Sequence, residues 1–279
     1  MRRSVLIMFA VAAGCANAQP PTPTYIPQTK FAKGQDVVPS FDGWIRNPDA
    51  TFTLVFGYMN RNYEEEFSIP PGPDNKIEPG PADQGQPSYF LPRRHAWMFR
   101  VIVPADFGNK EVVWTVTANG RTEKAYGHLI QDEEILERMI QTRGNLNPGL
   151  DDPNKSPSVS IMPVRSVTAR SPISLTAVVT DDGLPKPRVP KQGPAADPTK
   201  GQSNNAVARL RPGLHVTWLE YRGPGKVTFD ETGSIPVLNG QAVTKAHFPQ
   251  PGTYVLRATA NDGELSTAAD VTVNVTAGP

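Results

Sequence analysis

The alternation of apolar and polar residues near the end of the chain constrains its fold more than any other sequence feature. Val271, Val273 and Val275 alternate with polar residues, and the segment 253–260 alternates in the same way. This period of two is typical of strands that have one buried and one exposed face. The Asn-Asp-Gly sequence at 261–263 tolerates the positive φ angles of a tight turn. The pattern therefore predicts a β-hairpin.

Turn-forming residues divide the rest of the chain into similarly short segments. The sequence contains 30 prolines and 23 glycines. Proline lacks the amide that a helix interior or a central strand needs, so these residues favour many short strands joined by turns. We predict an all-β chain with two β-sandwich domains in tandem and one short helix near their junction, because about 260 residues suffice for two ordinary domains.

A leader of eighteen residues precedes the predicted fold. Two arginines, a short apolar run and the small residues 16–18 predict a signal peptide cut after Ala18. The sequence around Cys15 also resembles a lipoprotein signal, in which this cysteine would carry the lipid anchor. We therefore expect an exported protein, periplasmic or extracellular, with an outer-membrane lipoprotein as the alternative. No later apolar run is long enough to span a membrane, and residues 19–40 are expected to form a proline-rich tether.

The charge balance and the cysteine content exclude several classes of function. Removing the leader takes away two arginines and no acidic residue, so the formal net charge changes from +1 to −1. A nearly neutral chain has no general attraction for nucleic acid. The single cysteine lies in the leader, so a mature chain that begins after Ala18 has neither disulfides nor cysteine-based metal sites.

The first domain is predicted over residues 41–144. Its strands are expected at Thr51–Met59, Glu64–Ile69, Ala96–Val103, Glu111–Ala118 and Arg121–Leu129. Residues 70–92 contain seven prolines, which predicts a long loop rather than an interior strand. The helix is expected at 131–142, with Asp132 as its N-cap and Gly144 at its end. Its apolar stripe consists of Ile135, Leu136, Met139 and Ile140.

The second domain is predicted over residues 158–279, after a linker at 145–157. Its seven strands are expected at Ser158–Met162, Ile173–Thr180, Leu214–Tyr221, Lys226–Phe229, Ala242–Phe248, Thr253–Ala260 and Ala269–Thr276. Seven strands match an immunoglobulin-like sandwich. Trp218 on the third strand and Tyr254 at the start of the sixth occupy the positions of the buried tryptophan and the corner tyrosine of such domains.

The closing strands of this domain carry a resemblance to a known family. Pro251–Leu256, Asn261–Ser266 and Asp270–Val273 resemble the corresponding segments of PKD-type (polycystic kidney disease repeat) immunoglobulin-like domains. The resemblance covers roughly the last 120 residues, and the first half resembles no family that we recognise. The segment 184–213 departs from the pattern as a long basic insert. Its charges indicate either contact with an acidic partner or a solvated loop.

Acidic residues in two loops suggest a cation site. In an immunoglobulin-like sandwich the loop after the second strand and the loop after the sixth emerge at the same end. This topology would bring Asp181 and Asp182 near Asp262 and Glu264. Carboxylates are ligands that calcium prefers. The alternative is that these residues cap their own turns.

Aromatic and amide residues in the first domain suggest a ligand-binding surface. The candidate residues are Trp44, Asn60, Asn62, Tyr63, Asp74 and Asn75. Aromatic and amide groups together can bind a glycan or a peptide. The alternative is that they belong to the core and its turns.

The sequence contains no recognisable catalytic motif. The four histidines share no metal-ligand spacing, and the chain lacks a nucleophile elbow, a Walker loop and a His-Glu-x-x-His sequence. We therefore expect an exported, non-catalytic protein that needs no cofactor, with calcium as a possible bound ion. Its expected role is adhesion, scaffolding or ligand binding, and its expected partner is a protein or glycan of the bacterial envelope. The alternative is a secreted hydrolase or a carbohydrate-binding accessory subunit with a site in residues 70–92.

Overall fold

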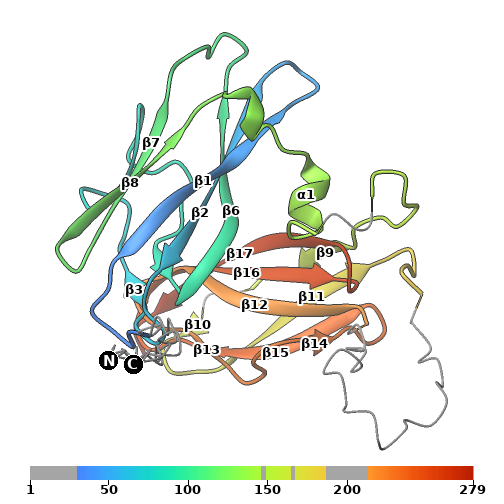
Figure 1. Ribbon diagram of the computed structural model, residues 1–279. Helices are drawn as coiled ribbons and strands as arrows, with labels where there is room; N and C mark the ends of the chain where they lie inside the picture. Colours follow the sequence, from blue (N-terminus) through green and yellow to red (C-terminus); the bar gives the residue numbers. More distant parts are fainter. Residues whose placement is uncertain (1–29, 146–148, 165–166, 187–212, 279) are drawn as a thin grey trace, which may run out of the picture. The chain divides into compact units, whose positions relative to one another are not determined.

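The structure is a computed structural model that describes residues 30–145, 149–164, 167–186 and 213–278. The leader with Cys15, residues 19–29 of the predicted tether and residues 187–212 of the basic insert lie outside the described residues. Nearly all elements of the described part are strands, which confirms the predicted all-β fold (Figure 1). No helix in the described ranges is long and apolar enough to cross a membrane.

The first sandwich consists of two three-stranded sheets and a small ribbon. One sheet has the order β1-β2-β6, and the other has the order β4-β7-β8. Their strands are β1 (Val37–Arg46), β2 (Phe52–Asn60), β4 (Asn75–Glu78), β6 (Arg93–Val103), β7 (Val112–Ala118) and β8 (Arg121–Gly127). Strands β3 (Phe67–Ser68) and β5 (Tyr89–Phe90) pair separately. In chain order the two sheets contain strands A, B, E and C, F, G of an immunoglobulin-like fold.

Aromatic side chains fill the space between these sheets. Phe56 of β2 and Phe99 of β6 stack with ring centroids 5.2 Å apart, and Trp114 of β7 packs edge-on against Phe99 at 4.8 Å. These rings are at most 5% exposed. The faces expected to be buried in residues 51–59 and 96–103 are buried except at Phe52 and Trp97, which are partly exposed.

The second sandwich has the strand order of an immunoglobulin-like domain. One sheet is β13-β15-β11-β9 and the other is β10-β17-β16-β12-β14. Its strands are β9 (Ser158–Ile161), β10 (Val167–Thr168), β11 (Ile173–Thr180), β12 (His215–Arg222), β13 (Thr228–Phe229), β14 (Ile235–Pro236), β15 (Gln241–His247), β16 (Gly252–Asn261) and β17 (Ser266–Thr276). The first sheet matches the order D-E-B-A, and the second contains G-F-C. All seven predicted strands are present, and β10 and β14 are additional.

Two side chains confirm the immunoglobulin-like character of this half. The Tyr254 hydroxyl donates a hydrogen bond to the Gln250 carbonyl at 2.9 Å, which is the geometry of a tyrosine corner. Trp218 of β12 is only half-buried, but it packs against both apolar clusters of the sandwich. The fold of this half is therefore the one that its strand pattern predicts.

Three local predictions for the first half need correction. Strand β1 begins at Val37, inside the segment expected to be a tether. Residues 70–92 are not strand-free, because they contain β4 and β5. Strand β4 contains no proline and forms an edge of its sheet, so the prolines around it do not interrupt the ladder.

The third correction concerns the predicted helix at 131–142. The structure has a 3-10 turn, η1 (Gln131–Glu133), and a five-residue helix, α1 (Glu137–Gln141). Between them the chain is extended, because the Ile135 N–H donates to the Trp44 carbonyl of β1 at 2.8 Å. Asp132 does not cap a helix, and neither short element has a buried residue. Gly144 does end the segment, with φ +76° and its N–H bonded to the Met139 carbonyl.

Candidate functional site

The proline-rich segment 70–92 of the first sandwich binds the end of strand β12. The Ser88 N–H donates to the Tyr221 carbonyl at 3.2 Å, and the Arg222 Nε donates to the Gln86 carbonyl at 2.8 Å. The Arg222 guanidinium also pairs with both carboxylate oxygens of Asp83, at 2.8 and 3.1 Å. Residues 83–88 of this segment, where the alternative interpretation placed a hydrolase site, are therefore engaged in contacts with the second sandwich.

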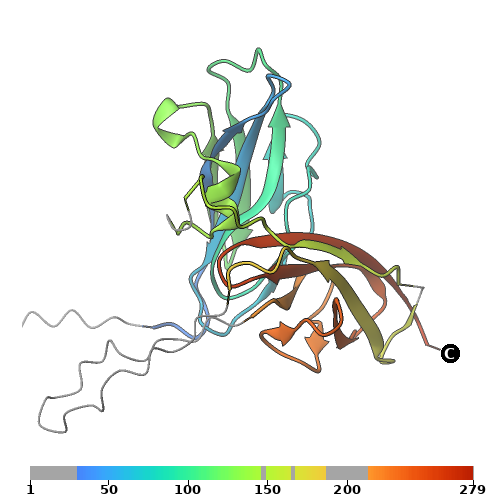
Figure 2. The ribbon, with the colours of Figure 1, turned by 90° about the vertical axis from the view of Figure 1, so that its right-hand side faces the viewer.

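A cleft of about 820 Å³ lies beside this contact. Residues of β6 form one wall, α1 and the turn after it form a second, and β12, β16 and β17 form the floor. Figures 1 and 2 both show α1 beside β17, and the Ser266 Oγ donates to the Gln141 carbonyl at 3.0 Å. The volume falls within the range of about 300–1,000 Å³ that is typical of ligand sites.

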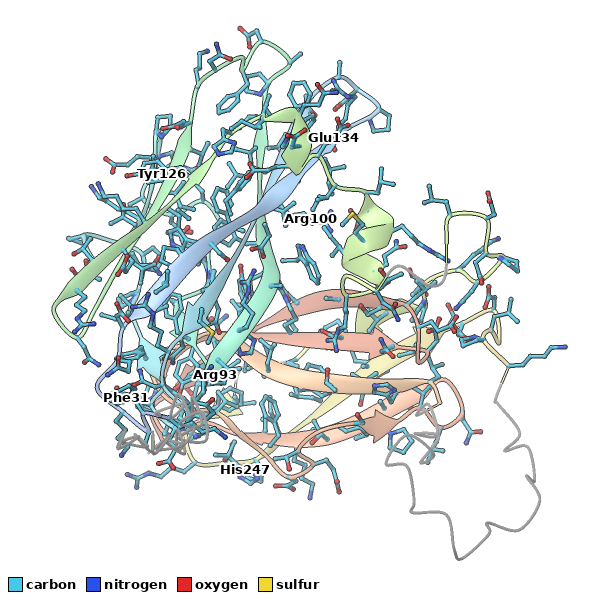
Figure 3. The ribbon with its side chains drawn as sticks, in the orientation of Figure 1. Phe31, Arg93, Arg100, Tyr126, Glu134 and His247 are labelled. Carbon is cyan, nitrogen blue, oxygen red and sulfur yellow. The ribbon has the colours of Figure 1, made fainter. Side chains whose placement is uncertain are left out.

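Ion pairs hold most of the charged side chains in the cleft. The Arg257 guanidinium binds both oxygens of Asp270 at 2.7 and 2.8 Å, lies 4.1 Å from the Tyr221 ring centroid and donates to the Met98 carbonyl. Arg100 of β6, labelled in Figure 3, binds both oxygens of Glu137 of α1 at 2.7 and 2.8 Å. The two carboxylates that line the cleft are therefore each occupied by an arginine.

Arg143 differs from the other cations of the cleft. Its side chain is exposed and forms no hydrogen bond or ion pair with any residue in the described part of the chain. It lies in the left-handed turn that ends α1, with φ +55°. This turn presents a free guanidinium at the cleft.

Trp97 provides an aromatic surface in the same cleft. Its φ angle is +53°, which is unusual for a bulky residue. The Trp97 N–H donates to Asp42 Oδ2 at 2.7 Å, and this bond holds the backbone in that conformation. A Cβ atom at Gly144 would lie 3.2 Å from the Trp97 ring, so the glycine allows the turn after α1 to lie against the indole. Strained backbone of this kind occurs preferentially at functional sites.

His95 is the one histidine that lines the cleft in the described structure. Its ring stacks on Tyr58 with centroids 5.0 Å apart, and Nε2 lies 3.2 Å from the Pro92 carbonyl oxygen. Burial lowers the pKa of His95 below its ordinary value. The ring therefore mainly packs against Tyr58 and the chain at the start of β6.

Four of the six residues proposed from the sequence as a ligand-binding surface are buried. Trp44, Asn60, Asn62 and Asn75 are at most 3% exposed. Their polar atoms bind the protein itself: the Trp44 Nε1 donates to Ile130 O at 2.7 Å, and the Asn60 Nδ2 donates to Glu65 O at 2.7 Å. The structure therefore does not support this surface, because these residues form the core.

The remaining two residues of that set lie apart from the cleft. Tyr63 is exposed and packs under the Arg93 guanidinium at 4.0 Å, and Asp74 lines a shallower hollow of about 350 Å³ beside residues 67–73. The cleft residues were not predicted from the sequence. Trp97 lies within the predicted strand 96–103 and Arg143 directly follows the predicted helix 131–142, and no local pattern indicated that both would line one cleft.

The four acidic residues of the predicted calcium site lie at one end of the second sandwich. Burial chiefly raises the pKa of Asp181, and the negative charges of Asp262 and Asp182 raise it further. Both oxygens of Asp182 accept backbone hydrogen bonds, from Lys155 and Leu184. The Glu264 N–H donates to Asp262 Oδ1 at 2.7 Å. No group of three or more His, Cys, Asp or Glu side chains arranged to hold a metal occurs among the described residues.

Comparisons with known proteins give only distant similarity. No protein-family model and no curated protein sequence matches the chain. Solved structures that align with it include the S-layer protein rSbsC (12% identity, TM-score 0.27, covering 82% of this chain and 24% of that one). The D00-D0 domain of intimin aligns at 12% identity and TM-score 0.29, covering 86% of this chain and all of that one.

The titin domains Z1Z2 in complex with telethonin align at 12% identity and TM-score 0.25, covering 86% of this chain and 91% of that one. This chain spans about a quarter of the S-layer structure that it matches. Alignments at these values do not indicate a shared function.

Proposed function

We propose that this protein is an exported, non-catalytic binding protein of the bacterial cell envelope or extracellular space, and that it holds a protein or glycan ligand in the cleft between its two sandwiches. The observation that carries the proposal is the pairing of an aromatic surface, Trp97, with an unpaired cation, Arg143, in a cleft of about 820 Å³. Sites that bind small ligands combine an aromatic wall with a few polar groups in this way.

The sequence supports export and an envelope role. Its first eighteen residues have the pattern of a signal peptide, with Cys15 as a candidate lipid anchor. We further propose that the second sandwich is of the PKD type, on the residues 251–256, 261–266 and 270–273. The non-catalytic role rests on the state of the cleft carboxylates, since Glu137 and Asp270 are each bound bidentately by an arginine.

The charge of the cleft indicates the kind of ligand. Four arginines line the cleft, against the two carboxylates Glu137 and Asp270, and Arg143 is the arginine without a partner in the described structure. An anionic group, such as the carboxylate of an acidic glycan or of an acidic peptide, would pair with this guanidinium. The indole of Trp97 would then contact the neighbouring ring or side chain of the ligand.

Binding to arrays of acidic glycans and acidic peptides tests the proposal. We expect Arg143→Glu to weaken binding of any retained ligand by at least about tenfold, because a charge pair becomes a repulsion. Arg121→Glu is the matched control, since Arg121 is exposed on β8 and does not line the cleft. Thermal melting of both variants checks that they fold.

Two results would contradict this function. Equal binding by the Arg143→Glu variant and the wild type would show that the ligand does not bind in the cleft. Turnover of a glycan or ester in a hydrolase substrate panel would favour the enzymatic alternative instead.

A further inference from the structure

Three side-chain oxygens at one end of the second sandwich are buried without a hydrogen-bond partner. They are Asn154 Oδ1, Asp181 Oδ1 and Asp262 Oδ2. Asn154 is 3% exposed and Asp262 is 5% exposed. Buried polar atoms in native proteins are nearly always paired, so a cluster of unpaired oxygens requires an explanation.

Strand pairing brings the three residues together from distant parts of the chain. Asn154 precedes β9, Asp181 follows β11 and Asp262 follows β16. Ser158 of β9 pairs with Thr180 of β11, and the Lys155 N–H donates to Asp182 Oδ2 at 3.0 Å. In Figure 1 the end of β11 and the turn between β16 and β17 lie at the same right-hand end of the second sandwich.

Electrostatic effects indicate that the three side chains lie close together. Burial raises the pKa of Asp262, while the Leu265 N–H and the adjacent Asn154 amide partly oppose this effect. The charge of Asp262 in turn contributes to the raised pKa of Asp181. The Asn154 amide therefore lies beside the Asp262 carboxylate, yet neither of its polar atoms has a hydrogen bond of good geometry.

Backbone bonds fix the second oxygen of each carboxylate. The Gly183 N–H donates to Asp181 Oδ2 at 2.9 Å, and the Glu264 and Leu265 N–H groups both donate to Asp262 Oδ1 at 2.7 Å. These turns leave Asp181 Oδ1 and Asp262 Oδ2 available. No lysine or arginine forms a salt bridge with either carboxylate in the described part of the chain. Two partly buried negative charges without a counter-charge are unfavourable.

We propose that Asn154 Oδ1, Asp181 Oδ1 and Asp262 Oδ2 bind one calcium ion, which links the segment before β9 to the two turns. All three donors are oxygens, and calcium takes six to eight oxygen ligands, including amide and backbone carbonyls and waters. The donor set differs from the four carboxylates expected from the sequence. Asn154 enters it, and Asp182 is outside it because both of its oxygens bind backbone amides.

Thermal unfolding of the full mature chain with and without calcium chloride tests the site. A cation that binds only the folded state stabilises it by mass action. We expect the midpoint to rise by roughly 5 °C or more at about 10 mM calcium, and by much less with magnesium chloride. Isothermal titration with calcium should show a single site.

Variants assign the effect to these residues. Asn154→Ala and Asp181→Asn should remove the calcium-dependent shift, and Asp181→Asn retains an acceptor for the Gly183 amide. Asn154→Asp adds a carboxylate, so it should lower the midpoint without calcium and enlarge the shift with calcium. Asp132→Asn is the control, because Asp132 is exposed in η1 and should leave the shift unchanged.

Two outcomes would overturn the proposal. One is an unchanged midpoint at about 10 mM calcium together with no heat of binding. The second is an equal shift with magnesium, which would reject the assignment to calcium.

Discussion

Buried amide side chains hold the loops of the first sandwich in place. The Asn75 amide donates to the carbonyls of Ile69 and Pro87 at 2.8 and 2.9 Å and accepts from Trp114 Nε1 at 2.9 Å. The Asn75 amide thus supplies hydrogen-bond donors to backbone carbonyls of a segment in which the prolines have no N–H group to donate. Asn60 and Asn62 act similarly near the end of β2. These amides resemble a binding surface in sequence because the same donors and acceptors serve both purposes.

Glu220 is a buried carboxyl of the second sandwich that titrates unusually. It is 3% exposed; its Oε2 accepts from the Val227 N–H at 2.8 Å and its Oε1 has no partner. Burial raises the pKa of Glu220 from 4.5 to about 8. The folded state therefore binds a proton that the unfolded state releases above pH 4.5, and stability falls as the pH rises from there to about 8.

We predict that Glu220→Gln stabilises the protein at pH 8–9 by about 1–3 kcal/mol and has little effect near pH 5. The amide keeps an acceptor for Val227 and removes the charge. Urea denaturation across this pH range measures the difference. A variant that loses stability equally at both pH values would show that the carboxylate has a favourable partner.

The contact between β12 and the segment 83–88 joins elements of the two sandwiches. Arg222 provides three of its hydrogen bonds, one to the Gln86 carbonyl and two to the Asp83 carboxylate. The hydrogen bonds from the Arg222 guanidinium lower the pKa of Asp83 below its ordinary value. The proline-rich segment, which its composition predicts to be a loop, is thus held in place by β12, more than 130 residues later in the sequence.

We predict that Arg222→Ala raises the pKa of Asp83 toward its ordinary value, as measured by NMR titration of the side-chain carboxyl. Lys226→Ala is the comparison, because Lys226 pairs with Glu66 of the same contact and has no bond to Asp83. If the pKa of Asp83 did not change on loss of Arg222, the ion pair would be absent in solution.

The two sandwiches share part of one apolar core. Tyr221 belongs to β12 of the second sandwich, yet it is 4% exposed within the core cluster of the first, beside partly buried Leu219 and Val255. Its hydroxyl donates to the Gly85 carbonyl. A buried side chain shared in this way couples the unfolding of the two halves.

We predict that differential scanning calorimetry of the intact chain shows one cooperative transition. Tyr221→Ala removes a large buried side chain at the contact, costs about 3–5 kcal/mol and should divide the transition into two. Tyr126→Ala, at a residue that is 47% exposed on β8, should leave a single transition. Two transitions in the wild type would mean that the contact does not couple the halves.

The local pattern of the sequence was sufficient for most of the long strands and for the sandwich architecture. Alternation in segments such as 271–276 depends only on neighbouring residues, and burial of one face follows wherever a second layer is present. The corner tyrosine Tyr254 was identified for the same reason, since its partner Gln250 is four residues away.

Contacts between distant segments decided the rest. The Trp44 carbonyl interrupts the predicted helix at Ile135, β12 contacts the proline-rich segment, and Asn154 lies beside the carboxylate of Asp262, more than 100 positions later in the chain. Each of these outcomes depends on which residues lie opposite one another across the fold. A local sequence pattern does not show which residues will be opposite one another. The free energy of burying an amide or a carboxylate depends on the hydrogen-bond partner that the folded chain provides.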